Sequence, residues 1–394
     1  MNKSATNGQR FRLALGDQAP AVVEVRERLA RLGYLAENSL TDSASNDVYD
    51  EDIYKAVRAF QLDRGIDSDG IVGLATFKRL EEARWNLGDR ILSYSATHMA
   101  AGDDVLALQQ RLNDLGFDAG RVDGVFGPDT DRAVREFQRN VGTSADGTCG
   151  PEMWADLDRL NRAVTGGASR VLRSEHFYDQ TRTGVANKVV ILDPGHGGPD
   201  YGTVANRLAE SIVADDLARR IEGRLAALGT QVLITRPTSM DLDYEISEAQ
   251  RAQYANENGA DLLVSLHTNS HSNPDARGVA TYYFGHEKGG SALGQWLAEL
   301  MLDEIVARTD LPDCRPHGKT WDLLRITRMP AVRIEAGFLT SPQDAARLED
   351  AAFRDALADA IAQAIVAFFD PTANEEDGHE AAVEAAAFAE LPDQ

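Results

Sequence analysis

The first 160 residues carry apolar side chains at the spacing of short amphipathic helices. Apolar residues recur every three or four positions in two segments. One face carries Val22, Val25, Leu29 and Leu32, and the other carries Val105, Leu108, Leu112 and Leu115. Gly33 and Gly116 follow at the position where glycine commonly ends a helix. A second apolar cluster ends at Phe60 or Phe137, and a third helix is predicted after each. We therefore expect two small three-helix bundles.

The two bundles are copies of one unit. The second halves align residue by residue: Ala56, Phe60, Gln61, Gly70 and Gly73 match Ala133, Phe137, Gln138, Gly147 and Gly150. The first copy carries a polar insertion, ENSLTDSASND, between its two matching blocks. It also has Asn46-Asp47 and Asp50 where the second copy has Asp123-Gly124 and Gly127. The turn chemistry of the first copy is therefore altered.

From residue 187 onward, buried strands alternate with helices. The runs VVILDPG, QVLITR, DLLVSLH and AVRIEAGF are short, apolar and typical of buried strands. Helical stretches separate them at 208–229, 246–259 and 291–309, and a last helix is predicted at about 343–369. The predicted fold class is an α/β domain, with a mixed, mainly parallel twisted sheet and helices on both faces, preceded by two small all-α domains.

These patterns divide the chain into six regions. They are an N-terminal extension (1–15), repeat 1 (16–84), repeat 2 (99–160), a linker (161–186), the α/β domain (187–370) and an acidic tail (371–394).

Charge and composition restrict the partners and the location. The chain has 40 basic and 63 acidic residues, a net charge of −23, which disfavours nucleic acid and anionic lipid as partners. Cys149 and Cys314 fall in different predicted domains, so no disulfide framework is expected. No secretory signal precedes the first repeat, and no apolar run reaches the roughly 18 residues that span a membrane. These features predict a cytoplasmic protein.

Three possible metal ligands lie near the ends of predicted strands. His196 follows the first strand in DPGHGG, Glu210 begins the next helix, and His267 ends a later strand in SLHTN. Open α/β sheets place ligands at the carboxyl ends of their strands. Two imidazoles and one carboxylate suit a catalytic zinc ion that keeps its fourth position for water. A lone histidine after a strand is usually packed or solvent-facing. Here two histidines and a glutamate occur in order, each at the end of a predicted element, and this combination favours one zinc site per chain.

The motifs resemble the zinc-dependent N-acetylmuramoyl-L-alanine amidase family of the amidase 3 type. The resembling segments are DPGHGG at 193–198, Glu210, SLHTN at 265–269 and PAVRIEAGFLTSPQD at 330–344. The resemblance implies His196, Glu210 and His267 as zinc ligands and Glu335 as the catalytic carboxylate. Glu335 would then exchange a proton with the attacking water and the leaving nitrogen. The alternative for Glu335 is a structural ion pair with Arg333 or Arg236.

The two repeats resemble the peptidoglycan-binding domain that accompanies many bacterial wall hydrolases. The resembling segments are LQQRLNDLGF, DGVFGPDTDRAVREFQ and DGTCGPEMWADL, all from repeat 2. Repeat 1 departs from the pattern at its turn, which leaves its glycan binding open. Both bundles acting only as scaffolds or protein docks is the alternative.

Other histidines and the cysteines receive no clear role. Asn269 is expected to line the site, whereas His271 and His317 fall in predicted loops where a surface role is at least as common. His98 and His176 lie outside the α/β domain, and Cys314 has no recognisable histidine partner for nucleophilic catalysis.

The order of domains also resembles actinobacterial members of the family that act in the cytoplasm. That resemblance rests on the segment CRPHGKTWDLLRITRMPAV and on the two preceding repeats. It implies a regulator of peptidoglycan precursor synthesis. The implied partner is the enolpyruvyl transferase that opens the pathway. Members of this group are phosphorylated in the tail, where this chain offers only Thr372. Two hypotheses follow: an amidase acting on peptidoglycan or its precursors, wall-associated or cytoplasmic, and a regulator that uses the amidase scaffold for binding.

Overall fold

The computed structural model describes residues 12–36, 47–161, 183–236, 244–286 and 289–370. The chain divides into two compact units, Met1–Gly167 and Ala168–Gln394, and each is described by itself. Most of the predicted extension and linker, the whole acidic tail, His176 and Thr372 lie outside the described residues. No helix in the described ranges is both long and apolar enough to cross a membrane.

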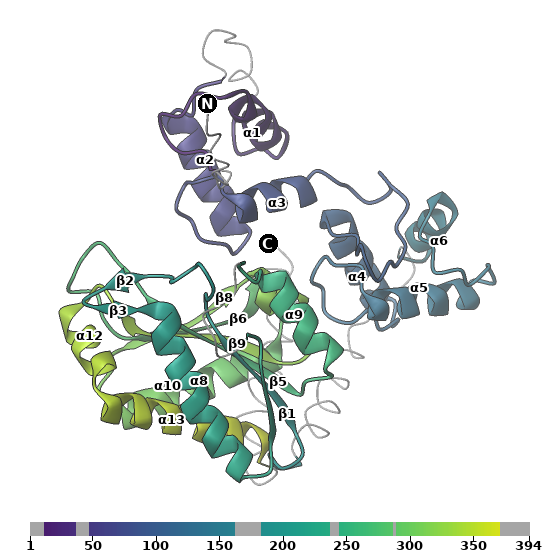
Figure 1. Ribbon diagram of the computed structural model, residues 1–394. Coiled ribbons are helices and arrows are strands. Elements are labelled where there is room, and N and C mark those ends of the chain that lie inside the picture. Colours follow the sequence, from purple (N-terminus) through teal and green to yellow (C-terminus); the bar gives the residue numbers. More distant parts are fainter. Residues whose placement is uncertain (1–11, 37–46, 162–182, 237–243, 287–288, 371–394) are drawn as a thin grey trace, which may run out of the picture. The chain divides into compact units, whose positions relative to one another are not determined.

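The first unit contains the two predicted three-helix bundles (Figure 1). Repeat 1 consists of α1 (Pro20–Arg31), α2 (Glu51–Asp63) and α3 (Leu74–Glu82), and repeat 2 of α4 (Asp103–Asp114), α5 (Pro128–Asn140) and α6 (Pro151–Asn161). Each bundle has its own apolar core. The predicted helical faces are its centre, since Val22, Val25 and Leu29 are fully buried, as are Val105, Leu108 and Leu112. Helical periodicity therefore gave the correct elements here.

The second unit is built on one mixed sheet. Within the described residues it has seven strands: β1 (Val189–Pro194), β4 (Gln231–Ile234), β5 (Leu262–Asn269), β6 (Val279–His286), β7 (Gly289–Gly290), β8 (Asp313–Lys319) and β9 (Ala331–Phe338). Their order is β4-β1-β5-β9-β6-β7, with β8 also paired to β6. Pairing is parallel from β4 to β9, and β6 runs antiparallel to β9. The predicted mixed, mainly parallel sheet is confirmed.

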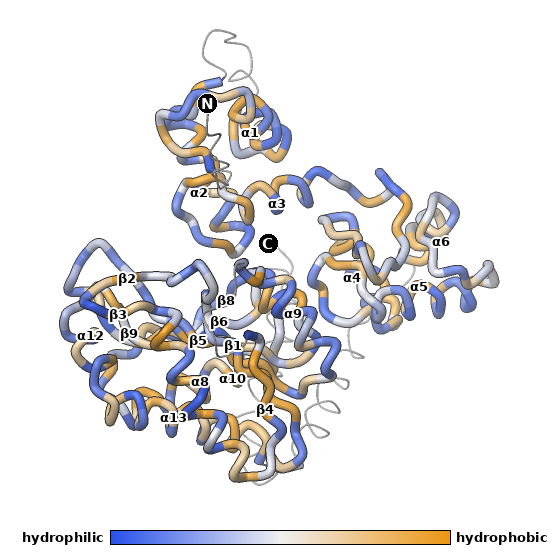
Figure 2. Tube along the Cα trace, viewed as in Figure 1, coloured by the Kyte–Doolittle hydropathy of each residue, from blue (hydrophilic) through white to orange (hydrophobic). Residues whose placement is uncertain are grey.

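Helices cover both faces of this sheet. α8 (Glu210–Ala227), α10 (Ala292–Arg308) and α13 (Ala351–Phe369) pack on one face in a large apolar cluster. α9 (Glu248–Glu257) and the short α11 (Asp322–Ile326) pack on the other face in a smaller cluster. Figure 2 shows the apolar character of strands such as β4 against the polar loops. A small hairpin of β2 (Val204–Ala205) and β3 (Leu208–Ala209) precedes α8.

The face under α9 and α11 changes from apolar to polar along three neighbouring strands. Alternate residues of a strand share a face. On β1 this face shows Ile191 and then Asp193, and on β5 it shows Leu263, Ser265 and His267. On β9 it shows Ala331, Arg333 and Glu335. The polar ends of these strands form the floor of the site described below.

The structure differs from the expected elements at several places, including the start of the helix expected at 208–229, whose first two residues form β3. The helix predicted at 343–369 is two helices, α12 (Pro342–Glu349) and α13, separated by Asp350. Asp350 has an extended backbone and its carboxylate accepts a hydrogen bond from the Ala352 N–H at 2.9 Å, so it caps a new helix. Strands β6 and β8 were not predicted: β6 has no regular alternation of buried and exposed residues, and β8, with the sequence DCRPHGK, alternates only between exposed and half-buried residues.

Candidate metal centre

His196 lies in a strained turn that immediately follows β1. Its φ is 58°, in the left-handed region that a non-glycine residue rarely adopts. Gly195 is required beside it, because a Cβ there would overlap the ring of His267. A Cβ at Gly202 would overlap His196 and Glu210 in the same way. The glycines thus leave the space that the two imidazoles and the carboxylate occupy.

Three buried arginine and aspartate groups hold the turn of His196 in place. Arg251 of α9 donates to the His196 and Pro194 carbonyl oxygens at 2.7 and 2.9 Å, and to Asp193 at 2.7 Å. Arg236 donates to the Pro194 oxygen at 3.1 Å and to the Ser211 oxygen at 2.7 Å. These bonds give the His196 and Pro194 carbonyl oxygens donors and tie the turn to α8 and α9. They also stabilise the strained conformation of His196.

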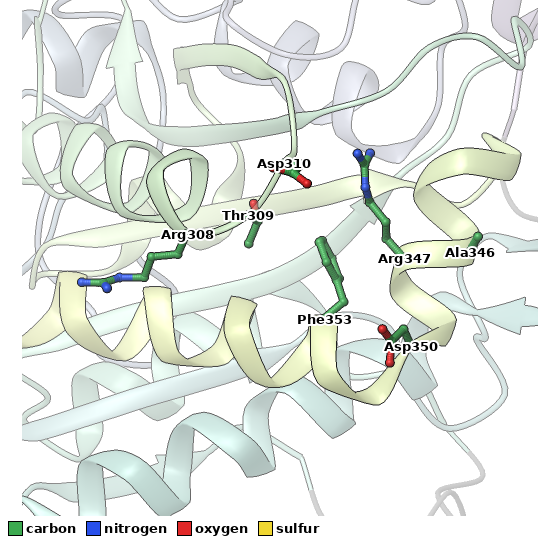
Figure 3. Close-up of a pocket in the computed structure, with 7 residues that line it drawn as sticks. All are labelled: Arg308, Thr309, Asp310, Ala346, Arg347, Asp350 and Phe353. Carbon is green, nitrogen blue, oxygen red and sulfur yellow. The ribbon is translucent and has the colours of Figure 1, made fainter.

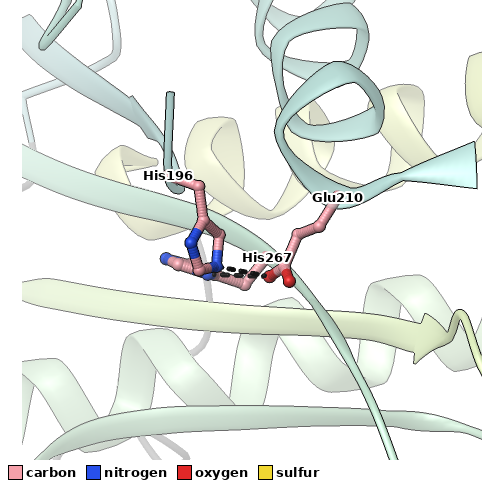
Figure 4. Close-up of side chains that lie close together, drawn as sticks. All are labelled: His196, Glu210 and His267. Carbon is pink, nitrogen blue, oxygen red and sulfur yellow. Dashed lines mark hydrogen bonds and ion pairs between the residues drawn. The ribbon is translucent and has the colours of Figure 1, made fainter. Parts of the chain in front are cut away.

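Glu210 is the first residue of α8, and its carboxylate is almost completely buried, at 3% exposure. Its Oε1 lies 3.2 Å from His196 Nε2 and 3.0 Å from His267 Nδ1. The N–H groups of Thr268 and Thr203 donate to its two oxygens at 3.1 and 3.0 Å. Figure 4 shows the two imidazoles converging on the carboxylate. The structure thus brings the three predicted ligand residues together.

The donor set fits a zinc ion. The ligand atoms of His196, Glu210 and His267 all lie within 4.8 Å of one another. Ligand atoms around a tetrahedral zinc stand roughly 3.3 Å apart, given bond lengths of about 2.0–2.2 Å. The two N···O separations of 3.2 and 3.0 Å are close to that value. The space kept by Gly195 and Gly202 is thus lined by groups of the right chemistry.

Asp200 orients His196. Its Oδ2 lies 2.8 Å from His196 Nδ1. An ionised carboxylate only accepts hydrogen bonds, so Nδ1 carries the proton and the lone pair of a neutral ring is on Nε2, which faces Glu210. This is the arrangement in which a second carboxylate fixes the tautomer of a metal-binding histidine. The sequence analysis missed Asp200, although it stands four residues after His196 in the same turn.

The electrostatic shifts follow from burial and from this convergence. Burial, reinforced by Arg333, lowers the pKa of His267 to about 4. Burial opposes ionisation of Glu210, but the hydrogen bonds from both imidazoles outweigh it and hold the pKa of Glu210 far below its usual range. Burial also disfavours a charged His196, yet Glu210 and Asp200 together raise its pKa. The cluster therefore favours an ionised Glu210 and a protonated His196, and it disfavours a charged His267.

Glu335 lies beside His267 in the sheet. The two residues are register partners on the parallel strands β5 and β9 and share a face. The Glu335 residue is buried, at 8% exposure. Its Oε1 accepts a hydrogen bond from Arg333 at 3.0 Å, and its Oε2 is 3.4 Å from the Tyr282 hydroxyl. Of the two arginines considered as partners, Arg333 therefore pairs with Glu335, whereas Arg236 holds the His196 turn.

The remaining candidate residues lie in varied surroundings. The Asn269 side chain accepts a hydrogen bond from the Ser270 N–H at 2.7 Å. The His271 ring accepts one from the Asn273 N–H at 3.0 Å in an exposed loop. His317 is exposed, bonds the Cys314 oxygen at 2.8 Å, and its ring lies 5.5 Å from that of Tyr282. His98 is exposed in the first unit. His317 alone of these reaches a neighbour of Glu335.

A second hollow in this unit lies where α10 ends and α12 meets α13 (Figure 3). It is lined by Arg308, Thr309, Asp310, Ala346, Arg347, Asp350 and Phe353. None of these residues belongs to the metal centre or contacts Glu335 in the interactions described above.

Both units of the chain are similar to known proteins. The family model described as N-acetylmuramoyl-L-alanine amidase matches residues 190–367. A model for a peptidoglycan binding domain matches residues 18–80 and 101–157. The amidase CwlM of Mycobacterium tuberculosis is 42% identical over 362 residues, which cover 90% of this chain and 88% of that protein. The amidase LytC of Bacillus subtilis is 29% identical over 191 residues, covering 48% of this chain and 37% of LytC. A solved amidase structure from Clostridium difficile 630 is 31% identical, covers 46% of this chain and 96% of that chain, and gives a TM-score of 0.43.

Proposed function

Because the chain belongs to the N-acetylmuramoyl-L-alanine amidase family, we propose that it is a zinc-dependent enzyme of that specificity. It hydrolyses the amide between the lactyl group of muramic acid and L-alanine, in peptidoglycan or in its precursors. One zinc ion per chain is held by His196, Glu210 and His267. Glu335 is the catalytic carboxylate.

Each ligand residue has a distinct task in this proposal. His196 offers Nε2 because Asp200 occupies Nδ1, and Glu210 supplies the negative charge that offsets part of the ion's charge. His267 binds as the neutral ring, which its lowered pKa favours near pH 7. When bound, zinc supplies Lewis-acid polarisation of the scissile carbonyl and makes a water molecule more acidic.

Glu335 moves the proton. Its carboxylate takes a proton from the attacking water and delivers it to the nitrogen of the leaving L-alanine. The two donors on its oxygens, Arg333 and Tyr282, hold the carboxylate aimed along the face that carries His267. General acid–base catalysis of this kind contributes roughly 10²–10⁴-fold to the rate.

The observation that carries the proposal is the convergence of His196 and His267 on the buried Glu210 carboxylate, with Glu335 in sheet register beside His267. A cluster made only for stability would pair donors with acceptors one by one. Here His196 Nε2 and Glu210 Oε1 face each other at 3.2 Å with the ring's proton already committed to Asp200. A proton on Nε2 or a shared metal cation resolves that contact, and we propose that zinc does so.

Release of stem peptide from a muropeptide tests the proposal. The zinc-loaded protein should release a peptide with a free L-alanine amino group. Glu335→Gln should lower kcat about 10²–10⁴-fold while the zinc content stays the same. The matched control is Glu349→Gln, since Glu349 is an exposed carboxylate paired with Arg207 and distant from the ligands in sequence. Zinc binding without cleavage by the wild-type protein would contradict the enzymatic function.

That contrary outcome would favour the second candidate, a regulator of precursor synthesis built on an amidase scaffold. The observation on its side is the 3.0 Å ion pair of Glu335 with Arg333, which a purely structural carboxylate would also make. In that case a precursor or a precursor-synthesis enzyme would bind without being cleaved. Cell fractionation would then separate a cytoplasmic role from a wall-associated one.

We assign glycan binding to the repeats, with the limits 16–84 and 99–160, and the hydrolase to 187–370. Repeat 2 supports this assignment best, because it keeps the Asp123-Gly124 turn that repeat 1 lacks. Binding of purified peptidoglycan by each repeat, expressed within the full chain with the other repeat's turn altered, would test the division.

A further inference from the structure

Arg333 joins the carboxylate of Glu335 to helix α9. Its Nη2 donates to Glu335 Oε1 at 3.0 Å, and its Nη1 lies 3.6 Å from Glu248 Oε1. Glu248 is the first residue of α9. The planar fork of the guanidinium therefore spans two carboxylates from different elements, which a lysine could not do with the same geometry.

The Trp321 ring packs against the Arg333 guanidinium. The Arg333 guanidinium carbon lies 4.5 Å from the centre of the Trp321 ring, and Lys319 Nζ lies 5.5 Å from the same centre. Cations are attracted to the face of an indole ring. The Arg333 side chain is 18% exposed, so its hydrogen bonds are shielded from most competing water.

Tyr282 holds the second oxygen of Glu335. Tyr282 and Arg333 are register partners on β6 and β9, and Ala280 is the register partner of Glu335. The Tyr282 hydroxyl is 3.4 Å from Glu335 Oε2. Each carboxylate oxygen therefore faces one donor, Arg333 at Oε1 and Tyr282 at Oε2. The small Ala280 leaves the side of Glu335 away from His267 without a bulky neighbour on that strand.

The same first turn of α9 also holds the metal turn. Arg251 stands three residues after Glu248 and donates to the His196 carbonyl oxygen at 2.7 Å. One helical turn thus contacts the His196 backbone through Arg251 and the Glu335 carboxylate through Glu248 and Arg333. Residues three apart lie on one face of a helix, which lets both reach the site.

Stability alone does not account for Arg333. Within the described residues its Nε is buried and has no hydrogen-bond partner. A buried donor left unpaired costs about 1–3 kcal/mol. An apolar residue at this strand position would avoid that cost, which suggests that the fork serves the carboxylate that it holds.

We propose that Arg333 is a positioning residue for amide hydrolysis, which sets the orientation of the Glu335 carboxylate relative to the metal centre and ties it to α9. The inference rests on the proposed function, because it concerns the same reaction. Its effect should fall on kcat, since the ion pairs of Arg333 are to Glu335 and Glu248 and not to the proposed zinc ligands. A misplacement of a catalytic group by 1 Å can cost about 10²-fold in rate.

Kinetics of Arg333→Met and Arg333→Lys in the full zinc-loaded chain test this role. Arg333→Met should lower kcat about 10–100-fold, with KM within about 2-fold of wild type and an unchanged zinc content. Arg333→Lys should recover part of kcat, because an ammonium still donates to Glu335 but cannot bridge to Glu248. Glu248→Gln should reduce kcat less than Arg333→Met does.

The matched control is Arg354→Met. The Arg354 side chain is also 18% exposed and forms a 2.5 Å ion pair, with Asp216, away from the sheet floor. It should lose stability comparably and keep kcat. The positioning role is overturned if wild type is active and Arg333→Met matches it, if both methionine variants lose kcat equally, or if Arg333→Met loses its zinc. A zinc-bound wild type with no activity would instead overturn the proposed function together with this inference.

Discussion

Gln138 in repeat 2 and Glu210 in the α/β unit are both nearly buried, at 5% and 2% exposure, but their surroundings differ in kind. The Gln138 amide donates to Asp146 Oδ1 at 2.8 Å and to the Thr148 oxygen at 3.0 Å. Its oxygen accepts from the Gly147 N–H at 2.9 Å. Donors and acceptors are matched, and the group closes a turn against its own helix.

Glu210 is surrounded differently. Two ring nitrogens approach one of its oxygens, and the proton of one ring is directed to Asp200 instead. The contact between His196 Nε2 and Glu210 then needs a proton or a metal cation to be favourable. The two buried polar clusters therefore differ in kind: the first is complete in itself, and the second is balanced only by an added proton or metal cation.

Zinc removal should separate the two clusters most strongly. A ligand that binds only the folded state adds about 4 kcal/mol at a concentration a thousand times its Kd. We expect zinc to protect amide hydrogens of residues 187–370 from exchange by that amount, and to leave residues 99–160 unchanged. Hydrogen exchange with and without a chelator measures both regions at once. Equal protection of both regions, or of neither, would contradict the distinction.

Gln138→Ala should destabilise repeat 2 and leave the metal centre unchanged. It leaves the Gly147 N–H and the Asp146 carboxylate without their buried partner, at a cost of about 1–3 kcal/mol in the unfolding of repeat 2. Zinc affinity should not change. Gln110→Ala is the control, because Gln110 bonds Asp114 on the helix surface. A similar loss in both variants would mean that the Gln138 cluster is not special to stability.

Asp200→Ala should weaken the metal site without removing a ligand. Loss of a residue that orients a metal-binding histidine typically costs 10–100-fold in metal affinity, or about 1.4–2.7 kcal/mol. A competition titration with a chelator measures this loss. Asp355→Ala provides the comparison, since Asp355 pairs with Arg220 and Arg224 on the surface. Unaltered zinc affinity in Asp200→Ala would argue against the proposed tautomer of His196.

The smallest expected effect distinguishes the two repeats. In repeat 2, Gln109 donates to the Val125 oxygen at 3.1 Å, whereas in repeat 1 the equivalent Arg26 donates to the Val48 oxygen at 3.2 Å and pairs with Asp50 at 2.6 Å. Repeat 1 therefore replaces a neutral clamp with a charged one. Arg26→Gln should cost about 1 kcal/mol or less, since Asp50 is partly exposed.

The salt dependence of stability tests whether Arg26→Gln acts through charge. Because ions screen a partly exposed pair, the stability difference between wild type and Arg26→Gln should shrink in about 1 M salt. Hydrogen exchange within 16–84 measures it. A difference that is independent of salt would show that Arg26 acts by packing instead of charge.

Most helices, the strands of the parallel part of the sheet and the convergence of the three candidate ligand residues could be predicted because their causes are local. Apolar spacing fixed the six helices of the repeats, and His196, Glu210 and His267 each stand at the end of an element with a strong pattern. Strand alternation also places Arg333 and Glu335 on one face, as the structure shows.

The supporting residues could not be predicted, because their partners are distant in sequence. Arg251 bonds a carbonyl oxygen 55 positions away, in a turn whose shape depends on the glycines after β1. Tyr282 reaches Glu335 only through the antiparallel pairing of β6 with β9, which no alternation pattern indicated. The break at Asp350 escaped prediction because the residues on both sides favour helix equally, and a side-chain cap decides between one helix and two.

The zinc content of wild type and of Glu210→Gln tests the central claim most directly. The glutamine keeps the size and planar shape of Glu210 but removes the negative charge between His196 and His267, and it replaces one of the two oxygens that accept the Thr203 and Thr268 N–H groups with a donor. After dialysis against micromolar zinc, we predict one zinc ion per wild-type chain and almost none in a Glu210→Gln chain with an unchanged circular dichroism spectrum. A zinc-free wild type, or equal zinc in both proteins, would contradict the assignment of His196, Glu210 and His267 as the metal site.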